Sequence, residues 1–188
     1  GIKKMHALLN VAVMAAHRAG DSLIRNLNKL EKIKSKVTLK GRNDFVCEAD
    51  VVAEKIAIET ILRHYPDHAI LAEESGQQGE SDYLWIIDPL DGTTNFLHGF
   101  PNFCVSIALM HDKKLVHAAV YDPIRQELFT ASEGQGAQLD GRKIRVSGEK
   151  NINRALIGTG FPYRDSNKAM QPYMNMLQIA IEETAGVR

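Results

Sequence analysis

Cysteine is scarce in this chain, with only Cys47 and Cys104 in 188 residues. The two are far apart and form no C-x-x-C pair, which excludes a disulfide scaffold and redox or zinc motifs of that kind. Such sparse use of cysteine is typical of a reducing compartment. We expect both residues to be buried thiols without a redox or metal role.

Long apolar runs are also missing. No stretch approaches the roughly 18 uncharged residues that span a bilayer, and the chain does not open with a signal peptide. We therefore expect a cytoplasmic protein with no membrane contact. The 23 Lys and Arg residues balance the 23 Asp and Glu residues, so the excess positive charge of a protein that binds nucleic acid directly is absent. Any anion site must be local.

Apolar residues recur at three-and-four spacing in two segments and predict amphipathic helices over residues 5–30 and 44–64. Asn43 or Asp44 is the expected N-cap of the second helix. Between them and a final predicted helix over residues 167–184, short apolar runs and turn residues predict strands. These strands are at residues 69–72, 84–87, 103–110, 115–121, 127–131, 142–146 and 155–160. The order favours an α+β fold, with helices layered on a large, mainly antiparallel sheet.

The strand at 84–87 runs into two aspartates, Asp88 and Asp91. Pro89 restricts φ and Gly92 tolerates unusual backbone angles, so the chain can turn sharply here. The turn can direct both carboxylates and the Leu90 carbonyl at one point, and hard divalent cations bind such oxygen ligands. The alternative is that Asp91-Gly92 is only a β-turn at the end of a strand.

A second strand also ends on acidic residues, because Glu73 and Glu74 follow the apolar run 69–72. If the two strands lie side by side, Glu73 and Asp88 meet at one edge of the sheet. Their oxygens would suffice for two Mg²⁺ ions that share Asp88, an arrangement that activates water and stabilises the leaving oxygen in phosphoryl transfer.

Gly92, Thr93 and Thr94 come directly after these aspartates. If a helix begins there, its free N–H groups would receive a phosphate. The Thr93 hydroxyl could then hydrogen-bond a water held by the metal while Glu73 accepts the water's proton. Ordinary helix capping by a threonine is the alternative. The pattern as a whole predicts a magnesium-dependent phosphatase for a small monoester.

The run Asp-Pro-Leu-Asp-Gly-Thr-Thr-Asn-Phe at residues 88–96, with Glu-Glu-Ser-Gly at 73–76, resembles the first signature of the inositol monophosphatase family. The likeness extends to residues 43–50, 120–129 and 158–162, and it is greatest to the bacterial SuhB-type inositol-1-monophosphatases. It implies Mg²⁺-dependent, Li⁺-sensitive hydrolysis of inositol-1-phosphate, a small phosphorylated polyol. Relatives with similar motifs act on fructose bisphosphate, adenosine bisphosphate or NADP, which are the alternatives.

Carried over residue by residue, the resemblance implies two or three Mg²⁺ ions. Glu73, Asp88 and the Leu90 carbonyl would bind the first ion, and Asp88 and Asp91 the second. Asp50, on the second predicted helix, matches a position that helps to bind a weaker third metal or its water. A capping or solvated helix aspartate is the alternative for Asp50.

The same resemblance assigns the substrate and its phosphate to Asp91, Gly92 and Thr93, and it makes Glu73 and Thr93 the catalytic residues. Lys40 matches a lysine in the family's mobile loop near the metals, which suggests a lid. A solvated basic loop is the alternative for this lysine-rich segment.

Members of the family continue beyond the position of Arg188 into a subdomain whose Trp-Asp motif completes the second metal site. We therefore expect residues 1–188 to be the N-terminal metal- and phosphate-binding part of such a domain, with the C-terminal subdomain missing. The resemblance also implies a homodimer. SuhB-type proteins are linked to RNA polymerase and ribosomal RNA antitermination, so a regulatory partner of the transcription machinery is a further alternative.

Overall fold

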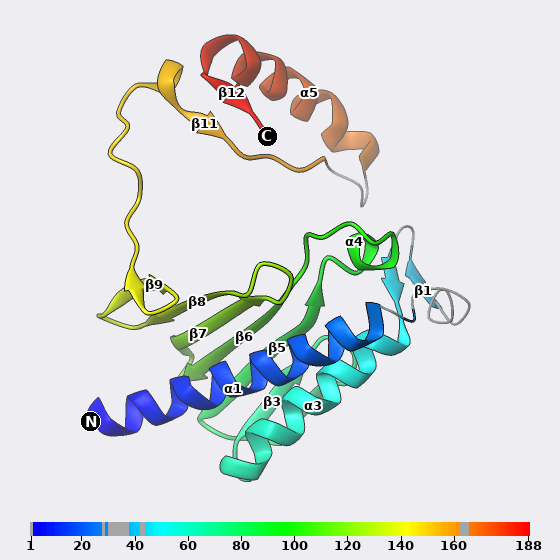
Figure 1. Cartoon of the computed structure of the whole chain (residues 1–188), viewed down its shortest axis with the longest axis vertical. Helices are drawn as coiled ribbons and strands as arrows, with labels where there is room; N and C mark the ends of the chain where they lie inside the picture. Colours follow the sequence, from blue (N-terminus) through cyan, green and yellow to red (C-terminus); the bar gives the residue numbers. More distant parts are fainter. Residues whose placement is uncertain (1, 28, 30–37, 42–43, 162–165) are drawn as a thin grey trace. The chain divides into compact units, whose positions relative to one another are not determined.

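The computed structural model describes residues 2–27, 29, 38–41, 44–161 and 166–188. The chain divides into two compact units, Gly1–Ile144 and Arg145–Arg188 (Figure 1). The larger unit contains the predicted acidic strand ends, so the candidate site is built from its residues. No helix in the described ranges is both long and apolar enough to cross a membrane.

Two long helices and two short strands begin the larger unit. They are α1 (Ile2–Leu27), β1 (Thr38–Gly41), β2 (Asp44–Val46) and α3 (Glu48–His64). β1 pairs antiparallel with β2. Both predicted helices are present, because each has an apolar face that must be buried, although their bounds differ from the predicted 5–30 and 44–64.

The start of α3 differs from the prediction. Asn43 or Asp44 was expected to cap the helix, but Asp44 lies in β2 and the residue before the helix is Cys47. The N–H of Cys47 donates to Asp50 Oδ2 at 2.8 Å. A carboxylate in the first turn therefore satisfies a main-chain donor where the extended chain becomes helical, and this local bond sets the boundary.

An eight-stranded mixed sheet follows, in the spatial order β10-β9-β8-β7-β6-β5-β3-β4. Its strands are β3 (Ala69–Ala72), β4 (Gly76–Gln78), β5 (Tyr83–Asp91), β6 (Cys104–His111), β7 (Lys114–Asp122), β8 (Glu127–Ser132), β9 (Gly136–Leu139) and β10 (Arg142–Lys143). A single-turn helix, α4 (Thr93–Leu97), connects β5 to β6. All neighbouring strands are antiparallel except β3 and β5. The expected α+β fold with a mainly antiparallel sheet is confirmed.

Three details of the sheet were not predicted correctly. β4 and β9 contain none of the β-branched or aromatic residues that favour strands, so their pairing depends on neighbouring strands rather than on local sequence. β10 ends at Lys143, although a strand was expected over residues 142–146.

α1 and α3 cover the same face of the sheet (Figure 1). Small side chains line the helices where they face the core, so the helices approach the sheet and each other closely. The large apolar side chains come mostly from the strands. Buried residues of this core include Ala12, Ala15, Ala16, Ala19, Ala49, Ala53 and Ala57 from the helices, and Trp85, Ile87, Val105, Ile107 and Leu109 from the sheet.

Four rings stack in a column at the end of the sheet where β5 begins. Tyr65, His68, Tyr83 and His111 follow one another with centroid separations of 4.6, 4.6 and 4.1 Å and nearly parallel planes. The indole N–H of Trp85 donates to His68 Nδ1 at 3.0 Å. The column joins β5 and β6 to the segment between α3 and β3.

The smaller unit contains a short parallel strand pair and a helix. Its elements are a 3₁₀ turn (Ile152–Arg154), β11 (Leu156–Ile157), α5 (Ser166–Glu183) and β12 (Gly186–Val187). The final helix matches the prediction over residues 167–184. The strand expected over residues 155–160 is shorter, because only two residues find a partner in β12.

Gly20 allows α1 to pass closely over β7. A Cβ atom at this position would lie 2.7 Å from the Tyr121 ring and 3.3 Å from Pro123 Cβ. The Tyr121 ring is buried and packs against His17, with 4.1 Å between the ring centroids, so it cannot easily move aside.

We expect Gly20→Ala to lower the free energy of unfolding by about 1–3 kcal/mol, although alanine favours a helix by about 1 kcal/mol. Urea unfolding measures this. The exposed Asn10→Ala is the control, and a Gly20→Ala protein as stable as the parent would contradict this packing.

Candidate metal and phosphate site

Glu73 and Asp88 lie at the same edge of the sheet because β3 and β5 run parallel. Ala72 pairs with Ile87, and the N–H of Glu73 donates to the Ile87 carbonyl at 3.1 Å. The next residue on each strand is acidic, so the common direction of the two strands places both carboxyl groups together. The two acidic strand ends found in the sequence therefore do meet.

A β-bulge in β5 brings Asp88 and Asp91 to one face of the sheet. In a regular strand, residues three apart point to opposite faces. Asp88 pairs with Ser106 of β6. Asp91 pairs with Cys104, only two residues away on β6, so β5 contains one extra residue here. Pro89 lies in this interruption and has no N–H to donate. The sharp turn expected after Asp88 is thus a bulge within a strand that continues to Asp91.

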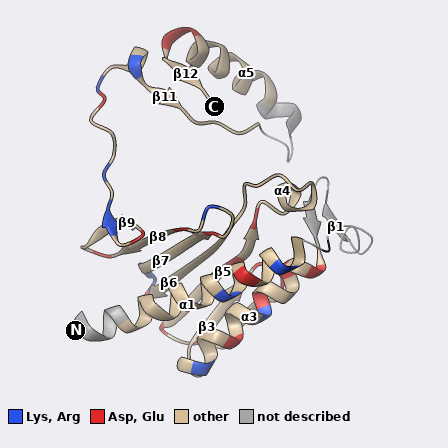
Figure 2. Cartoon of the chain, in the orientation of Figure 1, with Lys and Arg blue, Asp and Glu red and all other residues tan. Residues whose placement is uncertain are grey.

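The carboxyl groups at this edge repel one another. Burial raises the pKa of Asp88 from 3.8 to about 7, and the charge of Glu73, a hydrogen bond with Glu73 and the charge of Asp91 contribute further. The Leu90 N–H, which donates to Asp88 Oδ1 at 3.1 Å, lowers this pKa but is outweighed. Figure 2 shows the acidic end of β5. Among the described residues, no ion pair includes Glu73, Asp88 or Asp91.

These oxygen donors fit a hard divalent cation, although they are not drawn into one cluster. Glu73 lies close enough to Asp88 to raise its pKa, whereas Asp91 Oδ2 lies 3.9 Å from Cys104 Sγ. Within the described ranges, no three His, Cys, Asp or Glu side chains are grouped so as to hold a metal. Like charges stay apart unless a cation offsets their repulsion, and carboxylate and carbonyl oxygens are the ligands that Mg²⁺ prefers. The assignment of Glu73, Asp88, Leu90 and Asp91 to metal ions stays a prediction.

Asp50 and Thr93 form a pair beside these carboxylates. The Thr93 hydroxyl lies 3.1 Å from Asp50 Oδ1 and 3.1 Å from the Leu90 carbonyl, so it can donate to either. Asp50 is only 2% exposed, and burial raises its pKa despite opposing hydrogen bonds from Cys47 and Thr93. Asp50 is therefore not a solvated aspartate: one oxygen caps α3 and the other contacts Thr93. The sequence did not reveal this pair, because 43 residues separate its members.

Gly92 cannot be replaced without strain at the start of α4. Its φ is 98°, and a Cβ atom would lie 3.0 Å from the Asn102 carbonyl oxygen and 3.1 Å from Phe103 Cβ. The first helical bond runs from the Phe96 N–H to the Gly92 carbonyl at 2.9 Å, so the preceding N–H groups have no partner within the helix. The helix start expected at this position is present, but a single turn adds only a small dipole.

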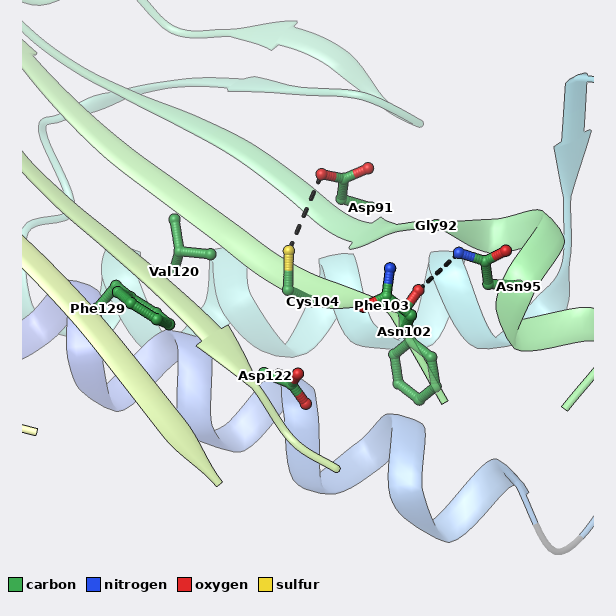
Figure 3. Close-up of a pocket in the computed structure, with 9 residues that line it drawn as sticks. All are labelled: Asp91, Gly92, Asn95, Asn102, Phe103, Cys104, Val120, Asp122 and Phe129. Atoms are coloured by element: carbon green, nitrogen blue, oxygen red, sulfur yellow. Dashed lines mark hydrogen bonds between the residues drawn. The ribbon is translucent and has the colours of Figure 1, made fainter. Parts of the chain in front are cut away.

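A cavity of about 280 Å³ adjoins Asp91 (Figure 3). It combines polar side chains around α4 with an apolar floor from β7 and β8. Its lining is Asp91, Gly92, Asn95, Asn102, Phe103, Cys104, Val120, Asp122 and Phe129. Cys104 was expected to be buried but is only half-buried at this cavity. Burial, followed by the charge of Asp91, raises the pKa of its thiol to about 12, so it is not a thiolate ligand.

The position of the Lys40 side chain, which the resemblance assigns to a lid, is not described. Lys40 lies in β1, but its side chain is outside the described part of the structure, as are residues 30–37. The lid therefore stays a prediction.

Glu54 of α3, which was not predicted to belong to the site, accepts hydrogen bonds from the N–H groups of Glu74 at 2.7 Å and Ser75 at 2.9 Å. No sequence motif marks a carboxylate that binds the main chain of a distant turn.

Comparisons with known proteins show which family the chain resembles in sequence and in fold. The chain matches the inositol monophosphatase family over residues 4–184. It is 48% identical to Nus factor SuhB of Pseudomonas aeruginosa over 98% of this chain and 69% of that protein. The crystal structure of extragenic suppressor protein suhB from Bartonella henselae superposes with a TM-score of 0.90 and 41% identity, covering 97% of this chain and 69% of that one. An inositol monophosphatase from Anabaena (Nostoc) sp. PCC 7120 gives a TM-score of 0.80 and 36% identity, covering 98% and 67%. The chain belongs to the inositol monophosphatase family.

Proposed function

We propose that this chain is the metal- and phosphate-binding part of a Mg²⁺-dependent, Li⁺-sensitive phosphatase that hydrolyses inositol-1-phosphate to inositol and phosphate. The observation that carries the proposal is the edge of the sheet that carries Glu73, Asp88 and Asp91 next to the Asp50–Thr93 pair. Membership of the family supports a phosphatase. The chain spans 69%, 58% and 70% of the lengths of the SuhB relatives from Pseudomonas aeruginosa, Xylella fastidiosa and Neisseria meningitidis, so the activity of the whole protein is part of the proposal.

Each oxygen donor has a distinct role in this proposal. Glu73, Asp88 and the Leu90 carbonyl would hold one Mg²⁺ ion, Asp88 and Asp91 a second, and Asp50 a third through water. Bound Mg²⁺ would polarise the phosphoryl group and lower the pKa of the attacking water. The raised pKa of Asp88 supports these roles, because burial and then the nearby charges of Glu73 and Asp91 raise it.

Thr93 is placed to orient the attacking water. Its hydroxyl proton is directed to Asp50 Oδ1 or to the Leu90 carbonyl, so the hydroxyl oxygen is left to accept a hydrogen bond from water. The hydrogen bond to Asp50 Oδ1 keeps the Thr93 hydroxyl in this orientation. Glu73 would accept the proton of the water. The N–H groups at the start of α4, beginning at Gly92, would hold the phosphate.

The substrate is proposed from family membership and from the cavity beside Asp91. Its volume of about 280 Å³ suits a small organic group rather than a macromolecule. Fructose bisphosphate, adenosine bisphosphate and NADP are the alternative substrates.

We also propose that the protein forms a homodimer, as the family resemblance implies.

Phosphate release from inositol-1-phosphate tests the catalytic proposal. We expect a rate that depends on Mg²⁺, falls with Li⁺, and decreases at least about 100-fold in Glu73→Gln and Asp91→Asn, because each removes a metal-binding oxygen. The exposed Glu80→Gln is the control for loss of one acidic charge and should retain the parent rate. Assays with fructose bisphosphate, adenosine 3′,5′-bisphosphate and NADP compare substrates. Phosphate release that is independent of Mg²⁺, or unchanged in both variants, would contradict the proposal.

The repulsion among the carboxylates predicts opposite effects of Asp88→Asn with and without metal. We expect the metal-free variant to be more stable than the parent by about 1 kcal/mol, or roughly 2–4 °C in Tm, since one of three like charges is removed. Mg²⁺ at about 100 times its Kd should stabilise the parent by about 2.7 kcal/mol but leave the variant unchanged. Differential scanning calorimetry measures both effects. Asp82→Asn, at the other end of the sheet, is the control and should respond to Mg²⁺ as the parent does.

A second function is supported by the name of several relatives, Nus factor SuhB. We propose that the protein also acts as a regulatory partner of RNA polymerase in ribosomal RNA antitermination. The absence of net positive charge favours contact with protein rather than autonomous binding to RNA. We expect purified RNA polymerase to retain the parent and Asp88→Asn equally, because this role needs no metal site. If polymerase retains neither protein, the regulatory role is excluded and the enzymatic proposal stands alone.

A further inference from the structure

Glu54 is a buried carboxylate with two main-chain partners. It is 3% exposed, and it lies on α3 facing the turn that follows β3. Its Oε2 accepts the Glu74 N–H at 2.7 Å, and its Oε1 accepts the Ser75 N–H at 2.9 Å. Both oxygens therefore bind the two residues directly after Glu73. Hydrogen bonds of this kind to a charged acceptor are among the stronger ones in proteins.

The turn held by Glu54 carries the proposed metal ligand Glu73. On its other side, Glu73 is held through its N–H, which donates to the Ile87 carbonyl at 3.1 Å. The main chain is thus bound immediately before the Glu73 side chain by the sheet and immediately after it by α3. A backbone fixed on both sides leaves only the side-chain torsions of Glu73 free.

Asp50 and Glu54 are four residues apart and so lie on one face of α3, one turn from each other. Asp50 accepts the hydroxyl of Thr93, at the start of α4. Glu54 accepts the turn after Glu73. A single helix turn therefore sets the distance between the two proposed catalytic residues, although they belong to separate segments of the chain.

The geometry points to Glu54 as the positioning residue that aims Glu73 at the first Mg²⁺ ion by binding the main chain of the β3–β4 turn. This inference rests on the proposed function and adds a residue to it. Glu54 itself touches neither metal nor substrate in this assignment. Outer partners of metal ligands affect affinity by restricting the ligands' orientation, and their loss typically weakens metal binding about 10–100-fold.

Calorimetric titration of the 188-residue chain with Mg²⁺ tests the inference. We expect Glu54→Gln to raise the Kd for Mg²⁺ about 10–100-fold, because an amide offers one acceptor where two N–H groups need one each. Glu54→Asp keeps the charge but is one methylene shorter, so it cannot reach both N–H groups and should also weaken binding. Thr60→Val is the control: Thr60 is buried on the same helix, and among the described residues its hydroxyl bonds only the Ile56 carbonyl. It should leave the Kd unchanged.

Kinetics separate positioning from a loss of folding. In Glu54→Gln, the Mg²⁺ concentration for half-maximal phosphate release should rise by the same factor as the Kd, whereas the KM for inositol-1-phosphate at saturating Mg²⁺ stays at the parent value. Circular dichroism confirms that each variant is folded at the assay temperature. A variant that loses rate without any change in Mg²⁺ dependence would show a general structural role and overturn the inference.

Three further outcomes would each overturn the inference. If Glu54→Gln binds Mg²⁺ as tightly as the parent, the positioning role is excluded while the proposed function survives. If Glu54→Asp behaves as the parent and only Glu54→Gln is weakened, the charge of Glu54 matters rather than its hold on the turn, and the inference is wrong. If the parent itself binds no Mg²⁺, the proposed function fails and the inference fails with it.

Discussion

The common direction of β3 and β5 is the constraint on which the site depends. Parallel strands bring their carboxyl ends to the same edge of a sheet, and here each end carries an acid, Glu73 and Asp88. The bulge in β5 then turns Asp91 to the face occupied by Asp88. An antiparallel pairing of the same two strands would have placed the acids at opposite ends, and a regular strand would have placed the two aspartates on opposite faces. Topology and one extra residue thus create a local concentration of negative charge in a chain with no net charge.

Holding like charges together costs folding energy, and the surrounding structure offsets that cost. The strands beneath the acids are anchored by a core in which small residues on α1 and α3 allow close packing against large ones on the sheet. α3 also contributes directly, since Asp50 and Glu54 bind the segments that carry Thr93 and Glu73. The helix therefore has two separate roles: its buried apolar residues stabilise the fold, and its buried acids arrange the polar edge.

The sequence predicted those parts of the site that are encoded locally. The apolar runs at 69–72 and 84–87, each followed by an acid, were sufficient to predict two strands and their acidic ends. The bulge was not predictable in the same way, because it is defined by the register against β6, where Asp91 pairs with Cys104. The link between Asp50 and Thr93 spans 43 residues, and Glu54 binds main-chain groups that leave no side-chain signature. These contacts depend on tertiary structure and were missed, whereas the helical periodicity and the acidic residues that follow the two apolar runs were predicted correctly.

The two ends of β5 differ in what holds them. At one end, Tyr83 belongs to a column of four stacked rings, and Trp85 is hydrogen-bonded to His68. At the other end, Asp88 and Asp91 have like charges for neighbours. Local opening of a sheet begins where the fewest favourable contacts must be broken. Amide protons near the ring column should therefore exchange with solvent only through global unfolding, while those next to the carboxylates exchange through small fluctuations, so that a single strand is rigid at one end and adaptable at the end that must accommodate a ligand.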